Sequence, residues 1–105
     1  MPPLDLVQLR YFQAIAHGQS ITAAARELGV SQPTLSVALK RLERSLGTSL
    51  LHRERGGVRL TRTGQELLGH ARDLLLSAKH AEEAVRGLET GDAADLVLAC
   101  PDALG

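Results

Sequence analysis

Aromatic side chains are almost missing from this sequence: Tyr11 and Phe12 are the only two among 105 residues. Proteins that bind single-stranded nucleic acid commonly stack unpaired bases on exposed aromatic rings. With so few rings, the sequence disfavours that class of protein. A nucleic-acid duplex is still a candidate ligand, because its grooves are contacted by hydrogen-bonding and small apolar side chains.

Cysteine is also scarce, since Cys100 is the only one. A single cysteine excludes a disulfide within the chain, which fits a reducing compartment. The four histidines are not spaced as metal ligands with each other or with Cys100. These histidines are His17, His52, His70 and His80. We therefore expect no metal site, and we expect Cys100 to be a small core residue.

The sequence has no apolar run as long as a membrane-spanning helix, and its start, MPPLDLVQLR, lacks the apolar core of a signal peptide. We expect a cytoplasmic protein without membrane contact. A glycine-rich phosphate loop is absent, and no nucleophile, base and orienting group form a recognisable catalytic set. The sequence therefore does not favour an enzyme.

The net charge is zero, but the charges are divided unevenly along the chain. Residues 1–62 hold nine Lys or Arg against four Asp or Glu, whereas residues 63–105 hold three against eight. A chain of this length buries one modest core. The basic first half is the half that we expect to face DNA.

The stretch SITAAARELGVSQPTLSVALKRLERSL, from Ser20 to Leu46, has the pattern of a helix-turn-helix. Ser20 is suited to cap the first helix and Gly29 to end it in the left-handed conformation. Ser31 is suited to cap the second helix, which tolerates Pro33 in its first turn. The apolar stripe of that helix is Leu35, Leu39, Leu42 and Leu46. The stripe predicts one buried face.

The opposite face of the second helix is small, mostly uncharged and ends in one cation. It comprises Gln32, Pro33, Ser36, Val37 and Lys40. Such a face is suited to enter a DNA groove when a glycine turn sets the two helices at a steep angle. On spacing alone, two ordinary core helices joined by a glycine turn are the alternative.

Before this motif, Asp5 and Gln8 are spaced like a capping box and predict a supporting helix that ends at Gly18. After it, two short extended segments are expected at residues 49–51 and 58–60, around a turn with two glycines. Arg53 and Arg55 lie on or near the tip of this hairpin. Next to a helix-turn-helix, the hairpin is interpreted as a wing that follows the DNA backbone or enters a minor groove; a merely solvated hairpin is the alternative.

A long helix is predicted for residues 63–88, capped by Thr61 or by Thr63 with Glu66. Its length of about 39 Å, at roughly 1.5 Å per residue, exceeds what so small a domain needs. Apolar residues recur along it at heptad spacing, at Leu67, Ala71, Leu74, Ala78, Ala81, Val85 and Leu88. We expect this seam to pair with a second copy. A long helix packed only on its own domain is the alternative.

The predicted fold is mainly α, a winged helix-turn-helix followed by a long dimerisation (linker) helix. We divide the chain into a DNA-binding domain at residues 1–62, a linker helix at 63–90, and a hinge with a first strand at 91–105. That strand, Leu96 to Ala99, ends before Pro101 and has no sheet to join. It is interpreted as the start of a truncated effector-binding domain.

These segments resemble, in order and in residues, the N-terminal region of the LysR-type transcriptional regulators, a bacterial family. The resemblance rests on LRYFQAIAHGQSITAAARELGVSQPTLSVALKRLERSLGTSLLHR, then GVRLTRTG, then the long helix with its leucines in register. It implies a regulator that binds a partly palindromic promoter element as a dimer or tetramer. It also implies a small-molecule coinducer for the missing effector domain, with no cofactor in this chain. RNA polymerase is a further candidate partner.

Carried over by position, the resemblance assigns base contacts to Gln32, Pro33 and Ser36, with Thr34 beside them. It assigns backbone contacts to Thr22 and Ser31, and it matches Arg53 to the arginine of the wing. We add Val37, Lys40 and Arg55 from their places in the predicted interface. Two positions depart from the family: Val37 replaces a frequent arginine, and Gly56 replaces the usual wing arginine, with Arg55 one residue earlier.

The function that this sequence predicts is sequence-specific binding of double-stranded DNA by a transcriptional regulator. A winged protein-interaction module that does not contact DNA is the alternative from another class. Another winged-helix repressor family is a third interpretation, which the long heptad seam disfavours.

Overall fold

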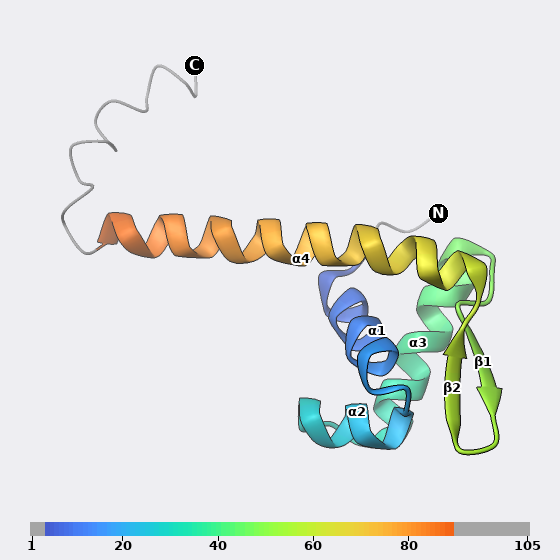
Figure 1. Ribbon diagram of the computed structural model, residues 1–105. Helices are drawn as coiled ribbons and strands as arrows, with labels where there is room; N and C mark the ends of the chain where they lie inside the picture. Colours follow the sequence, from blue (N-terminus) through green and yellow to red (C-terminus); the bar gives the residue numbers. More distant parts are fainter. Residues whose placement is uncertain (1–3, 90–105) are drawn as a thin grey trace. The chain divides into compact units, whose positions relative to one another are not determined.

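The computed structural model describes residues 4–89 and confirms the predicted mainly α, winged fold (Figure 1). Three short helices are followed by a hairpin and one long helix. The elements are α1 (Leu6–Gly18), α2 (Ile21–Leu28), α3 (Gln32–Leu46), β1 (Leu51–Glu54), β2 (Gly57–Leu60) and α4 (Arg62–Glu89). A compact unit ends at Leu75, within α4, so the boundary that we expected at residues 62–63 falls inside it. The hinge and strand expected after residue 90 lie outside the described residues.

Local capping bonds set the ends of the short helices, as the sequence predicted. The Ser20 hydroxyl accepts a hydrogen bond from the N–H of Ala23 at 3.1 Å, and the Ser31 hydroxyl accepts one from Thr34 at 3.2 Å. Gly29 and Gly47 end α2 and α3 with φ of 71° each. These bonds satisfy amides and carbonyls that a helix end leaves unpaired.

Helix α1 ends at Gly18, as predicted. The left-handed residue that follows is Gln19, with φ of 55°. Glycine is the usual residue for that conformation, so a glutamine there was not expected. The start of α1 does follow the prediction, because the Asp5 carboxylate accepts a hydrogen bond from the N–H of Val7 at 2.8 Å.

One apolar core joins α1, α2 and α3. Leu35 and Leu42 of α3 are fully buried, and Leu39 is 5% exposed. Leu46 is partly buried, so the predicted leucine stripe is confirmed. The other core side chains are Phe12, Ile15, Ile21, Ala24, Ala25 and Leu50. Burial of this stripe fixes which face of α3 points away from the protein.

The hairpin begins later than predicted. Its first strand is Leu51–Glu54, and the prediction of residues 49–51 was wrong because Leu50 is buried in the core instead of pairing in the sheet. The Glu43 carboxylate accepts hydrogen bonds from the N–H groups of Leu50 at 2.7 Å and Leu51 at 3.4 Å. Glu43 thus anchors the wing to the end of α3, a role that sequence reasoning missed.

The tip of the wing is a tight turn. Strand pairing runs from Leu51 with Leu60 to Glu54 with Gly57, which leaves Arg55 and Gly56 in the turn. The N–H of Val58 donates to the carbonyl of Gln19 at 3.1 Å, so β2 is tied to the turn between α1 and α2. A Cβ atom on Gly57 would overlap that carbonyl, and Gly57 has φ of 157°. The glycine is needed for this close approach.

Thr61, not Thr63, caps α4. Its hydroxyl accepts a hydrogen bond from the N–H of Gly64 at 2.9 Å and donates to the carbonyl of Ser49 at 2.8 Å. Gly64 is buried, and a Cβ atom there would overlap the carbonyl of Leu50. The first turn of α4 therefore lies directly against the start of the wing.

The two halves of α4 differ in burial. Leu67 and Leu68 pack on the core, and Ala71 is fully buried within the chain. By contrast, Val85 in the second half is 57% exposed, and Leu74, at the end of the first half, is already 42% exposed. None of the helices described at residues 4–89 is both long and apolar enough to span a membrane.

Candidate nucleic-acid interface

The exposed face of α3 lies opposite its buried leucines. Gln32, Pro33 and Thr34 are exposed in the first turn, and Ser36 is half-buried. Val37 is 50% exposed and Lys40 is also exposed. Because Ser31 caps the helix just before Gln32, this face begins at the helix N-terminus, where unpaired amides favour contact with anions.

A shallow hollow joins α2, α3 and the wing. Thr22 of α2, Gln32 of α3 and Arg53 of β1 all line it. Ser20 and Gly56 line the same hollow. Three residues assigned to DNA contact from separate parts of the sequence therefore surround one space. Its lining contains hydroxyl, amide and guanidinium groups, which are donors suited to phosphate and base-edge oxygens. The Glu54 carboxylate also lines it and is paired with Arg59.

Ser31 and Thr34 form a local pair. Their hydroxyl oxygens lie 2.7 Å apart, and the Ser31 hydroxyl also accepts the N–H of Thr34. Both residues are exposed. The pair holds its hydroxyl groups in place at the start of α3, so a phosphate contact there would require little reordering.

A second hollow lies on the other side of α3, against the start of α1. Pro33, Thr34, Val37 and Arg41 line it from α3, with Val7 from α1. Arg41 was not among our predicted contacts, although it is an exposed cation one turn after Val37. That helical spacing is the signal that could have identified it.

The cations of the wing differ in their surroundings. Arg59 forms a salt bridge with Glu54 at 3.0 Å across the hairpin. Arg53 and Arg55 form no salt bridge within residues 4–89, and both are exposed. Arg53 lies in β1 opposite Val58, whereas Arg55 lies in the turn. Arg53 and Arg55 are therefore the cations of the wing available to a phosphate backbone.

Lys40 lies 3.9 Å from the Glu43 carboxylate. Its side chain is 66% exposed, whereas that of Glu43 is only 13% exposed, and the separation is long for an ion pair, so the pair holds Lys40 weakly. Lys40 is thus free to exchange this partner for a phosphate.

No group of three His, Cys, Asp or Glu within the described part of the chain is placed to hold a metal ion.

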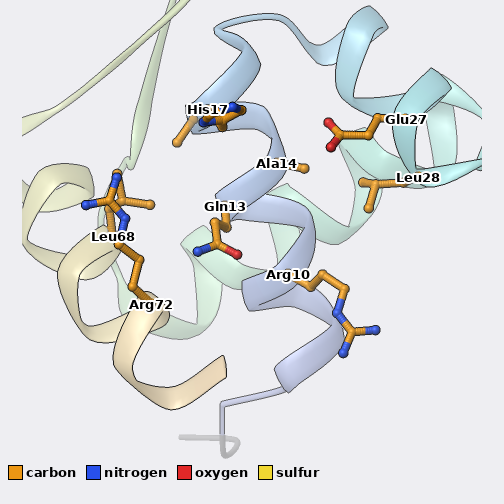
Figure 2. Close-up of a pocket in the computed structure, with 9 residues that line it drawn as sticks. Arg10, Gln13, Ala14, His17, Glu27, Leu28, Leu68 and Arg72 are labelled. Carbon is orange, nitrogen blue, oxygen red and sulfur yellow. The ribbon is translucent and has the colours of Figure 1, made fainter. Parts of the chain in front are cut away.

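A separate pocket is formed by α1, α2 and the first half of α4 (Figure 2). It is lined by the charged side chains of Arg10, Glu27 and Arg72, and by the imidazole of His17. Figure 2 shows Gln13 projecting from α1 between these groups. None of the residues that we assigned to DNA contact lines this pocket. It is distinct from the two hollows beside α3.

The residues assigned to dimerisation differ in how far their own chain buries them. Ala71 has no exposed surface, and Leu67 packs on the core of its own chain. The remaining members of the seam retain exposed surface in the single chain. They are Leu74, Ala78, Ala81, Val85 and Leu88.

The chain is similar in sequence and in fold to known proteins. A family described as bacterial regulatory helix-turn-helix protein, lysR family, matches residues 6–65. The HTH-type transcriptional regulator BudR of Raoultella terrigena is 42% identical over 94 residues, which cover 90% of this chain and 32% of BudR. The chain thus spans about a third of that relative's length.

Two solved structures are similar over most of the chain. The crystal structure of the CbnR_DBD-DNA complex matches with a TM-score of 0.77 and 36% identity, covering 82% of this chain and 99% of that one. The BenM_DBD/catB site 1 DNA complex matches with a TM-score of 0.78 and 34% identity, covering 82% and 96%. Both similarities extend beyond the helix-turn-helix itself.

Proposed function

This chain belongs to the lysR family of bacterial regulatory helix-turn-helix proteins, and from that premise we propose that it recognises a specific sequence in double-stranded DNA. The resemblance noted in the sequence is thereby confirmed. The chain is not an enzyme, because the relatives that it matches are transcriptional regulators. Its proposed role is that of the DNA-binding part of a regulator.

The observation that carries this proposal is the shared hollow of Thr22, Gln32 and Arg53. It adjoins the exposed N-terminal face of α3, the part of a helix-turn-helix that enters the major groove. Gln32, Pro33 and Ser36 would contact base edges, with Thr34 beside them. The backbone contacts would come from Thr22, Ser31, Lys40, Arg53 and Arg55. Two similar structures are complexes with DNA, which supports a duplex as the ligand.

We further propose that two or four copies act together on a partly palindromic promoter element. The exposed apolar residues of α4 from Leu74 onward, including Val85, would pair two helices. Each copy would then place one α3 in a major groove. Half-sites on one face of the duplex would lie one or two turns apart, at about 34 to 36 Å per turn.

A longer regulator would have two other partners. A small-molecule coinducer would bind an effector domain, and RNA polymerase would be contacted at the promoter. Both partners are proposed from family membership alone.

The test is fluorescence anisotropy with a labelled duplex from upstream of the protein's own gene and a scrambled duplex of equal composition, each at two salt concentrations. We expect tighter binding to the upstream duplex and a steep loss of affinity with salt, because phosphate contacts release counterions. Equal affinity for both duplexes would contradict sequence-specific recognition of that site. No binding at low salt would favour the protein-interaction module.

A further inference from the structure

Val37 is the residue in the N-terminal half of α3 that points most directly away from the protein. At about 100° per residue, it lies roughly opposite the mean direction of the buried leucines of α3. Leu35 and Leu42 are fully buried on that side, whereas Val37 is 50% exposed. If α3 enters a major groove, the side chain at the centre of its leading face is therefore apolar.

The neighbours of Val37 leave it protruding. Ser36 and Ala38, on either side along the chain, are small and half-buried. Pro33, one turn earlier, and Val37 line the same hollow. Two exposed cations, Lys40 and Arg41, follow within one turn. They are placed to hold this face against phosphates while Val37 reaches the base edges.

The major groove offers one apolar group to such a side chain, the C5-methyl of thymine. A valine has no hydrogen-bonding atom and cannot satisfy the donors and acceptors of a guanine or cytosine edge, so placing it there would leave them unpaired. We propose that Val37 packs on the C5-methyl of one thymine in each half-site and determines the base at that position. This inference rests on the proposed DNA-binding function.

The experiment begins with the 105-residue chain and a random duplex library, from which bound sequences are selected and read. In the selected half-site, each thymine is then replaced singly by deoxyuridine, which removes only the methyl group. We expect one position at which this change weakens binding about fourfold, the equivalent of about 0.8 kcal/mol for one buried methyl group. The other thymines should be insensitive or respond through other contacts.

Three variants assign the effect to Val37. Val37→Ala should bind the thymine and deoxyuridine duplexes equally at that position, and Val37→Ile should retain the difference. Val37→Arg should instead select guanine there, because a guanidinium pairs with its O6 and N7. Leu76→Ala is the matched control, since Leu76 is 52% exposed but lies on α4. It should select the same sequence as the unaltered chain.

The possible outcomes distinguish a failure of the role proposed for Val37 from a failure of the proposed sequence-specific DNA binding. A library that yields no preferred sequence would overturn both. A clear preferred sequence with no methyl-sensitive thymine would leave sequence-specific binding intact and overturn the role of Val37. The role would also be overturned if Val37→Ala kept the methyl sensitivity, or if it altered only the oligomeric state. Circular dichroism of each variant would verify that it folds.

Discussion

The two halves of α4 carry the same apolar spacing in opposite environments. In the first half, Leu67 packs on the core and Ala71 is fully buried by its own chain. In the second half, Val85 is 57% exposed. One continuous heptad pattern is thus covered by its own chain in one half and left exposed in the other. The pattern alone predicts that a partner exists but not which one.

The two proposed roles, DNA contact and pairing between copies, therefore fall in different parts of the chain. The compact unit that ends at Leu75 contains every residue that we assign to DNA contact. The second half of α4 contains most of the apolar surface that we assign to pairing. Substitutions in the compact unit should therefore change its stability or its affinity for a single half-site. Substitutions beyond Leu75 should change only the binding of paired half-sites.

The largest effect is expected from Gly64→Ala. The new Cβ would overlap the carbonyl of Leu50, and a shift there disturbs both the wing and the first turn of α4. We expect a loss of at least about 3 kcal/mol in the free energy of unfolding, measured by urea denaturation. Gly69→Ala on the same helix is the control. No atom lies within 4 Å of the new Cβ, so stability should rise by about 0.5 to 1 kcal/mol.

Equal effects of these two substitutions would show that helix propensity, not close packing, governs this half of α4. That result would contradict the close packing described for the first half of α4.

Gln32→Ala should weaken binding to a single half-site by about 1 to 3 kcal/mol and relax the preference at one base position. The amide of Gln32 lines the hollow beside the wing and would form paired hydrogen bonds to a base edge. Competition anisotropy with half-sites altered at each position measures both effects. The exposed Gln65 of α4 supplies the control, Gln65→Ala. A uniform loss on all sequences would assign Gln32 to the backbone instead.

Val85→Lys should weaken association between copies by at least about tenfold, or about 1.4 kcal/mol, because a charge would enter the apolar seam. Sedimentation equilibrium measures this change. Affinity for a single half-site and the unfolding midpoint of the compact unit should be unaltered. Leu76→Lys is matched in exposure but lies off the seam, so it should leave association unchanged. Equal effects of both lysines would argue against a heptad interface.

The smallest effect is expected from Arg55→Ala. Arg55 lies at the wing turn and forms no salt bridge among residues 4–89. Its loss should weaken binding to every duplex and lower the slope of log affinity against log salt by about 1. Arg72→Ala removes the same charge from the separate pocket and should leave the slope unchanged. A change of sequence preference with Arg55→Ala would mean that the wing contacts bases.

Local sequence predicted the helix-turn-helix closely because its determinants are local. Ser20, Ser31 and Gly29 act on backbone groups within a few residues, and their capping bonds and left-handed turn follow from residue type. The leucine stripe of α3 is likewise a property of one helix. The residues that we propose to contact DNA were therefore placed on the face opposite the leucines from sequence alone.

Features set by distant parts of the chain were not predictable in this way. The wing starts at Leu51 because the core buries Leu50 and Glu43 accepts its N–H. Gly64 is required by the approach of a carbonyl fourteen residues earlier in the sequence. The burial of Ala71 also depends on the folded core rather than on its helix. In each case, the partner lies on another element.

The bond from the N–H of Val58 to the carbonyl of Gln19 has a consequence for the thermodynamics of recognition. It fastens the wing to the turn that leads into α2, while Glu43 fastens its other strand to α3. A hairpin restrained at both strands loses little conformational entropy when it meets a phosphate backbone. The distance between the wing and α3 is thus fixed in the free protein. A DNA groove whose width does not match that distance would have to deform in order to bind.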